Sequence, residues 1–350
     1  MKKHISAILC TCIIFLSLFS FSSCGSQKIK YSKEYYDYFD TVTRIIGWAD
    51  SEAEFDTVCD DVKNQLEFYH KRYDIYTSYD NINNLATVNS LENGEHREVK
   101  VDKAVAELLV FCKDMHQKTE GKLNVAMGSV LSIWHQYRSR WTDTENPSEA
   151  ELPQMKALKE AELHTDINNL IIDEQKGTVY LKDGEATLDV GAVAKGYATE
   201  RIAEYLSSNG ITGYCINIGG NVRVIGSDNA KPWTVGIENP DSTENYLAVL
   251  ELEDTSLVTS GNYQRFYVVD GKSYHHIIDP DTLMPCEKYK SVSVITKDSG
   301  LADALSTTLF LMDYEEGKAL LQEYENTEAM WVLNNGEIKY SQGFREYIKK

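Results

Sequence analysis

The chain has 350 residues and carries 54 acidic against 35 basic side chains, a formal net charge of −19 at pH 7. A chain this acidic is a poor partner for nucleic acid or an anionic membrane surface, because both would repel it. With 42% hydrophobic residues and no low-complexity tract after residue 30, it can still bury a proper core. An anionic ligand would need local help from a metal ion, a lysine or helix N-termini.

The first 23 residues are typical of an export signal. Two lysines precede an apolar run over residues 7–21, which is too short and too rich in serine for a comfortable membrane span. Small residues and then Cys24 follow, as in bacterial lipoprotein signals, and the polar residues 24–34 suit a flexible tether. We therefore expect an acylated Cys24 that anchors the body outside the cytoplasm, at the bacterial cell membrane. A plain signal peptide and a retained N-terminal anchor are the alternatives.

Four cysteines remain in the body of the chain: Cys59, Cys112, Cys215 and Cys286. They lack the C-x-x-C spacing of a metal cluster. Two stand in apolar helix or strand patterns, which favours buried free thiols and leaves a disulfide as the alternative.

Four segments have the apolar spacing or the end signals of helices. They are residues 55–73, a segment from Asp102 to about Gly121, one opened by Asn146 and Pro147, and one from just after 189–191 to 209–210. Proline suits the first turn of the third of these, because its missing N–H is not needed there.

From residue 213 to residue 297 the chain is mostly strand. The expected strands are 214–218, 222–225, 233–237, 246–252, 256–259 and 292–296. Asp270-Gly271 and the segment 334–336 are turn signals of hairpins. With no internal repeat and no long linker, this pattern predicts an α+β fold with mixed and antiparallel sheets flanked by helices, in which residues 35–348 form one large domain or two intimate lobes.

The segment from Asp189 to Lys195 has the layout of a phosphate site. A short strand, Thr187-Leu188, leads into a turn at Gly191 and then a helix N-terminus, which offers backbone N–H groups and a positive dipole end. Lys195 adds a full charge on the first turn. A purely structural turn is an equally good interpretation of these residues alone.

A second segment could hold a cation. Ser299 fits the N-cap of a helix, so that Asp303 and Thr307 lie one turn apart on the same face. A carboxylate and a hydroxyl are hard oxygen ligands of the kind that Mg²⁺ prefers. The alternative is an acid favoured near a helix start and a packed polar residue.

Two adjacent histidines, His275 and His276, follow the Asp270-Gly271 turn on one strand. Neighbouring strand residues point to opposite faces, so only one of them can easily serve a given site, for instance as a general base. The other interpretation leaves His275 as a solvent-facing residue with no role.

In their order and spacing, eight segments resemble the ApbE family of flavin transferases. They are 39–41, 121–124, 188–198, 217–221, 232–237, 259–263, 276–280 and 302–307. The resemblance implies an ApbE-type domain that binds FAD as substrate with Mg²⁺ on its diphosphate. It implies Asp303, Thr307 and the Ala192 carbonyl as metal ligands, with Ser306 as a further candidate, and His276 as the base.

The resemblance also implies a set of flavin-contacting residues. They are Phe39, Tyr76, Asn124, Asp189, Lys195 and Ile278. Three of these depart from the family pattern: Phe39 stands where methionine is usual, Asn124 where aspartate is usual, and Tyr76 aligns only loosely.

The expected reaction is transfer of the FMN-phosphoryl group of FAD to a Thr or Ser hydroxyl of an acceptor flavoprotein outside the cytoplasm, with release of AMP. One alternative is an FAD pyrophosphatase that gives FMN and AMP. The other is a lipoprotein that binds FAD without turnover.

Overall fold

The computed structural model describes residues 28–91, 97–142, 144 and 147–350. The expected export signal, the acylated Cys24 and the helix-opening Asn146 lie outside these residues. Within the described ranges, no helix is both long enough and apolar enough to cross a bilayer.

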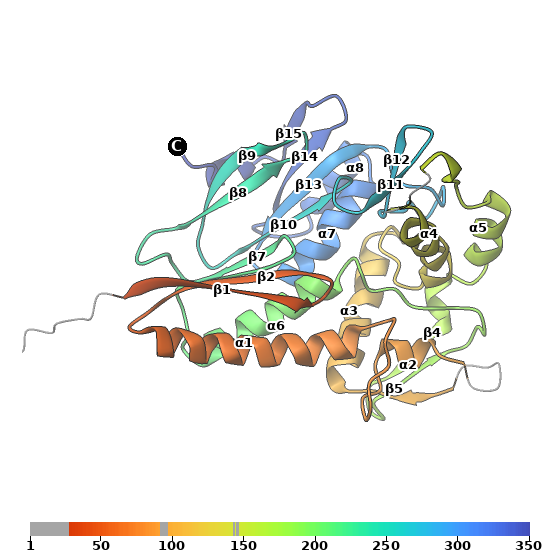
Figure 1. Cartoon of the computed structure of the whole chain (residues 1–350), viewed down its shortest axis with the longest axis horizontal. Coiled ribbons are helices and arrows are strands. Elements are labelled where there is room, and N and C mark those ends of the chain that lie inside the picture. Colours follow the sequence, from red (N-terminus) through yellow and green to blue (C-terminus); the bar gives the residue numbers. More distant parts are fainter. Residues whose placement is uncertain (1–27, 92–96, 143, 145–146) are drawn as a thin grey trace, which may run out of the picture.

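An eight-stranded sheet forms the centre of the fold (Figure 1). Its order is β1-β2-β6-β7-β10-β13-β14-β15, and each neighbouring pair is antiparallel. The strands are β1 Ile29–Tyr38, β2 Thr41–Ala49, β6 Tyr214–Ile218, β7 Asn221–Ile225, β10 Ser256–Gly261, β13 Tyr289–Thr296, β14 Glu328–Leu333 and β15 Ile338–Tyr340.

Helices cover one face of this sheet and a strand pair covers the other. The covering helices are α1 Glu52–Tyr73, α6 Ala194–Ser208 and α7 Ser299–Leu311, and the pair is β8 Trp233–Asn239 with β9 Ser242–Leu252. Strand β6 shows how one sequence serves both layers. Ile216 belongs to the apolar cluster with α1 and α6, whereas the preceding Cys215 belongs to the cluster with β8 and β9. Successive strand residues point to opposite faces, so this sheet is buried on both sides.

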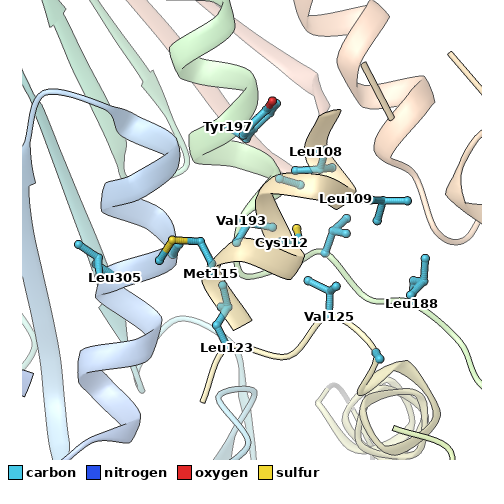
Figure 2. Packing of buried hydrophobic residues seen from close by; sticks show 14 of the residues in the cluster. Leu108, Leu109, Cys112, Met115, Leu123, Val125, Leu188, Val193, Tyr197 and Leu305 are labelled. Carbon is cyan, nitrogen blue, oxygen red and sulfur yellow. The ribbon is translucent and has the colours of Figure 1, made fainter. Parts of the chain in front are cut away.

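The largest apolar cluster extends the helical layer away from the sheet. It includes α3, Lys103–Lys118, whose residues Leu108, Cys112 and Met115 are almost fully buried. Figure 2 shows these side chains beside α6 and α7, with which they share the cluster. The core therefore fixes the N-terminus of α6 and the first turns of α7, both of which matter for the site below.

The remaining elements surround this core. They are α2 Leu85–Asn89, α4 Gly128–Trp141, α5 Met155–Glu162, α8 Tyr314–Leu321, β3 Val99–Lys100, β4 Leu170–Asp173, β5 Thr178–Leu181, β11 Phe266–Val269 and β12 Lys272–His275, with short 3-10 turns at Pro147–Glu149, Ile167–Asn169 and Phe344–Tyr347. Helices α4 and α5 pack with the β11–β12 hairpin at one end of the molecule (Figure 1).

Most predicted elements are present, and the fold is α+β as expected. The strands from 213 to 297 and both hairpins are confirmed; Asp270 and Gly271 both have positive φ, at 50° and 79°, as a tight two-residue hairpin turn requires. The four body cysteines are free and buried, which confirms that prediction.

Four local predictions differ from the structure. Residues 147–149 form a 3-10 turn, and the α-helix expected there begins only at Met155. Thr187 makes an isolated bridge to Met127 rather than a strand. The N-cap of α7 is Asp298, whose side chain accepts from Leu301 N–H, so Ser299 is already inside the helix. Strand β1 overlaps the expected tether over 24–34 from Ile29 onward, because it pairs along its length with β2.

Helix α4 was not predicted. Its N-cap, Met127, makes no side-chain capping bond, and only Gly128, Val130, Trp134 and Trp141 of its residues are buried. A helix with so sparse an apolar stripe and no start signal gives little periodic pattern to read.

Candidate functional site

A cavity of about 1410 Å³ lies where α4, α7, the N-terminus of α6 and strand β10 come together. Ligand pockets typically measure roughly 300–1,000 Å³, so this one suits a large ligand such as a dinucleotide. Every residue predicted above for flavin or base chemistry lines it, and so do Ala192, Asp303 and Thr307. Ser306 is the exception among the predicted site residues.

Asp303 supplies the buried carboxylate of the cavity. Its side chain is 4% exposed, and Oδ2 accepts from Gly196 N–H at 2.8 Å. Burial raises the pKa of Asp303, opposed by the charge of Lys195, by the Gly196 N–H and by the side chain of Asn221. A cation bound beside Asp303 would offset the cost of burying its charge.

Hydroxyl groups on α7 and β10 form a connected set beside Asp303. Thr307 lines the cavity one turn further along α7, and Ser260 Oγ on β10 lies 3.2 Å from Thr307 Oγ1. Ser306, predicted as a further metal ligand, is fully buried behind the wall, where it donates to the Asp303 carbonyl and lies 2.8 Å from Ser260 Oγ. Ser306 follows Asp303 by three residues, and its hydroxyl faces β10 rather than the cavity.

Asn221, the last residue of the family-like segment 217–221, adds an oxygen that was not predicted as a ligand. It is 2% exposed and lines the cavity, and its Oδ1 has no hydrogen-bond partner among the described residues. Buried polar atoms are rarely left unpaired, so this oxygen, on a side chain that contacts Asp303, is suited to bind a cation or water. The described residues hold no cluster of three His, Cys, Asp or Glu side chains that could bind a metal. The available donors are one carboxylate with hydroxyl and amide oxygens, a set that suits Mg²⁺.

The N-terminus of α6 opens into the same cavity. Its N-cap, Val193, makes no side-chain capping bond, and of its first-turn N–H groups that of Gly196 already donates to Asp303 Oδ2. Lys195 Nζ lies 3.4 Å from the Gly191 carbonyl, beside this end of the helix. Asp189 shapes the turn by accepting from Gly191 N–H at 2.8 Å. A helix end and a lysine facing a cavity form an anion site.

His276 and His275 have opposite surroundings, as the strand geometry predicts. His276 lines the cavity, and its Nδ1 lies 3.3 Å from the Arg265 carbonyl. An N–H at Nδ1 donates there, which leaves Nε2 as a proton acceptor. His275 is only 6% exposed and its Nε2 donates to the Cys286 carbonyl at 2.8 Å. The interpretation of His275 as solvent-facing is therefore wrong, because the hairpin folds its face onto the core.

Two arginines give the wall around His276 a positive charge. Arg138 on α4 and Arg265 both line the cavity. Burial first, and then the charges of Arg265 and Arg138, lower the pKa of His276 to about 3. The imidazole is therefore neutral at physiological pH, as a proton acceptor must be.

The residues predicted to contact the flavin all line this cavity, and they differ in how firmly the surrounding structure holds them. Ile278 is buried in the wall, and Phe39 adopts a positive φ of 54° with its N–H donating to His70 Nδ1 at 3.2 Å. The amide of Asn124 is held by backbone groups, since it donates to the Thr165 carbonyl at 2.9 Å and accepts from Ala126 N–H at 3.0 Å.

One wall of the cavity was missed because its helix was missed. Met127, Leu131, His135, Arg138 and Thr142, at and along α4, all line the cavity. Their spacing of three or four residues places them on one face of the helix. The sequence signal for this wall is the repeat of three or four residues itself. It was not recognised because the repeating side chains are partly polar rather than all apolar.

Comparisons with known proteins identify the family to which the chain is similar. A family model described as the ApbE family matches residues 39–331. A protein of Klebsiella pneumoniae (strain 342) named FAD:protein FMN transferase is 32% identical over 265 residues, covering 73% of this chain and 79% of that protein. A protein of the same name from Treponema pallidum (strain Nichols) is 31% identical over 267 residues, covering 72% and 71%. The crystal structure of the ApbE protein of Thermotoga maritima superposes with a TM-score of 0.79 at 26% identity, covering 92% of this chain and all of that one.

Proposed function

This chain belongs to the ApbE family of flavin transferases, and from that premise we propose that it transfers the FMN-phosphoryl group of FAD to a Thr or Ser hydroxyl of an acceptor protein. AMP is the leaving group. The observation that carries the proposal is the cavity, which brings a buried carboxylate with hydroxyls, a helix N-terminus with Lys195, and the neutral His276 to one space.

The residues of the chain account for each part of the transfer. Nε2 of His276 takes the proton of the acceptor hydroxyl, whose oxygen then forms a bond to the FMN-side phosphorus. The bond from that phosphorus to the AMP oxygen breaks, and the negative charge passes to the AMP phosphate. Lys195 and the N-terminus of α6 stabilise this charge, because preorganised donors need no reorganisation as it develops.

The oxygen donors at the α7 end of the cavity suit Mg²⁺. The Asp303 carboxylate and the Thr307 hydroxyl would hold it, with the Ala192 carbonyl as a third ligand, and the unpaired Asn221 oxygen and Ser260 hydroxyl lie close by. When bound, the ion supplies positive charge to the diphosphate. The support for this part of the proposal is the chemistry of the donor set.

The proposed setting of the reaction is outside the cytoplasm. The residues up to Cys24 have the pattern of a lipoprotein signal, so the enzyme is held at the bacterial membrane by its lipid and meets exported acceptors there.

The decisive experiment incubates the enzyme with FAD, Mg²⁺ and candidate exported acceptors, and measures the intact mass of the acceptor. The expected result is a mass increase equal to one FMN-phosphoryl group, which is lost when a chelator is added. Free FMN and AMP without an adduct would establish the pyrophosphatase alternative. Bound FAD that remains intact would establish a carrier, and either result would overturn the transferase proposal.

A further inference from the structure

Tyr76 is an exposed aromatic side chain that is held at both ends. It is 66% exposed, and of the exposed large apolar side chains in the described part of the chain it is the one that lines the cavity. Its backbone N–H donates to Asp74 Oδ1 at 2.7 Å, and its hydroxyl lies 2.8 Å from His135 Nδ1. Ordering an exposed side chain costs conformational entropy, and the protein's own packing covers little of this ring. The ordered ring face is therefore suited to a ligand in the cavity.

His135 connects this ring to the other side of the cavity. It lies on α4, and its Nε2 is 3.7 Å from Asp189 Oδ2. Burial lowers the pKa of His135, which favours the neutral ring. A tyrosine hydroxyl keeps its proton at physiological pH. Tyr76 O–H then donates to Nδ1, and the single ring N–H, on Nε2, faces the carboxylate.

Asp189 continues the connection to the phosphate end. While Oδ2 faces His135, Oδ1 accepts from Gly191 N–H at 2.8 Å, in the turn that leads into α6. The side chains of Tyr76, His135 and Asp189 thus form one chain of contacts from the exposed ring to the anion site. A shift of His135 would break both side-chain contacts, leaving Tyr76 held by its backbone N–H and Asp189 by Gly191 N–H.

We propose that His135 is a positioning residue for the bound dinucleotide, one that fixes the Tyr76 ring as a stacking surface for a planar ring of FAD and orients Asp189 beside it. The inference rests on the proposed function, because it takes a flavin nucleotide as the occupant of the cavity. Two planar rings, the isoalloxazine of the FMN half and the adenine of the AMP half, share the required chemistry. Fragment binding separates them.

Three substitutions of His135 separate its two contacts. His135→Phe keeps a flat ring and removes both hydrogen-bonding nitrogens. His135→Asn places an amide close to the position of Nδ1 and can still meet Tyr76, whereas His135→Gln places one close to Nε2 and can still meet Asp189. Tyr76→Phe removes the same hydroxyl contact from an exposed position, where loss of folding is not expected.

The measurement is direct binding, without turnover. FMN is titrated by its fluorescence and AMP by calorimetry, and FAD is titrated in the presence of EDTA. We expect His135→Phe to weaken binding of FAD and of one fragment by roughly 3- to 10-fold, the range that one net hydrogen bond supplies. A loss confined to FMN assigns the stacked ring to the isoalloxazine, and a loss confined to AMP assigns it to the adenine.

Rescue and coupling complete the test. His135→Asn should recover most of the affinity and His135→Gln should not. Tyr76→Phe should cause a similar loss, and adding it to His135→Phe should cost little more, because both remove one contact. In turnover assays the KM for FAD should rise while kcat changes less. Gln136→Ala, at the exposed neighbouring position on α4, is the matched control and should leave binding unchanged.

The outcomes that overturn the inference differ from those that overturn the function. Wild-type protein that binds FAD while His135→Phe binds it equally well removes His135 from its role. Rescue by Gln alone, additive losses, or a fall in kcat at constant KM would each contradict the contact with Tyr76. Wild-type protein that binds neither FAD nor FMN overturns the proposed function and this inference with it.

Discussion

Asp303 and His276 show, at the scale of single residues, how burial prepares a side chain for chemistry. Asp303 is a buried carboxylate with a raised pKa, so a cation bound beside it would favour its ionised form. His276 has the reverse environment, because burial and two arginines keep its imidazole neutral. In the proposed mechanism Asp303 serves the cation end and His276 the basic end of one cavity.

Asp303→Ala should abolish transfer by weakening retention of Mg²⁺. The remaining oxygens are neutral, and a divalent cation is bound poorly without its carboxylate. Ser306→Ala is the comparison variant, because Ser306 lies behind the wall, and we expect it to keep most of the activity. The check is the transfer rate against Mg²⁺ concentration for both variants. A wild-type rate and Mg²⁺ dependence for Asp303→Ala would remove it from the site.

His276→Ala should keep FAD binding and lose transfer by roughly 10²- to 10⁴-fold, the usual contribution of a general base. His164→Ala is a suitable control, since this histidine pairs with Asp183 and does not line the cavity. Fluorescence titration and acceptor mass spectrometry measure the two properties separately. An unchanged transfer rate would end the assignment of His276 as the base.

The low pKa of His276 also predicts the pH dependence of the free enzyme. With a pKa of about 3 rather than 6.5, the base stays unprotonated down to low pH. At saturating Mg²⁺ we expect kcat/KM, which reports the free enzyme, to show no acid limb near pH 6.5. The acid limb of kcat should lie at a higher pH than that of kcat/KM, because the bound diphosphate stabilises the protonated ring. A kcat/KM limb at pH 6.5 that disappears in a His276 variant would contradict this.

The low pKa of His276 also predicts how the free energy of unfolding depends on pH. Below pH 6.5 the unfolded chain binds a proton at His276 that the native state binds only near pH 3. The contribution of His276 to the free energy of unfolding therefore declines as the pH falls from about 6.5 toward 3.

At the scale of elements, the close approach of α6 to α7 builds the site. Gly196 on the first turn of α6 gives its N–H to Asp303 on α7, and an added Cβ there would overlap the Ser299 carbonyl and the Asp303 side chain. The glycine therefore lets two helix N-terminal regions meet, one carrying the anion site and the other the cation site. Without that contact the two halves of the site would be held apart.

Gly196→Ala should destabilise the fold by about 1–3 kcal/mol, the usual cost of overpacking, and should reduce Mg²⁺ affinity as well. Gly184→Ala is the control, because a Cβ at this exposed glycine meets no atom within 4 Å, and its effect should stay within roughly 0.5 kcal/mol. Urea unfolding measures both variants. Equal stabilities would show that the two helices can adjust to the extra atom.

At the scale of the whole molecule, the net charge and the proposed lipid anchor have opposite effects on membrane attachment. The formal charge of −19 repels the acidic surface of a bacterial membrane, so the body itself has no attraction to it. The proposed acyl chains on Cys24 supply the attachment, at about 0.8 kcal/mol for each buried methylene group.

Cys24→Ser should therefore move the protein from the membrane fraction to the soluble fraction of cells. The purified variant should transfer FMN at the wild-type rate, because the catalytic residues all lie in the folded body. Fractionation with labelled palmitate in the growth medium measures both the location and the acylation. Labelled, membrane-bound Cys24→Ser protein would contradict the lipoprotein assignment.

Local sequence signals were enough for the strands and the main helices. The Asp270-Gly271 turn, the Asp102 N-cap and the apolar spacing of α1 act between near neighbours, so their structure follows from a few residues. Asp303 and Thr307 share a helix face for the same reason. The eight family segments supplied the rest of the predicted site.

Other features depend on contacts between distant parts of the chain, and only the tertiary structure decided them. The sparse apolar stripe of α4 becomes a cavity wall because the β11–β12 hairpin packs against it, which brings His135 to Tyr76 and Asp189. Asn221 and Ser260 reach the cation end only because β7 and β10 pair beside α7, while Ser306 turns behind the wall. Burial and the direction of a side chain are properties of the assembled layers, and residue spacing along the sequence does not contain them.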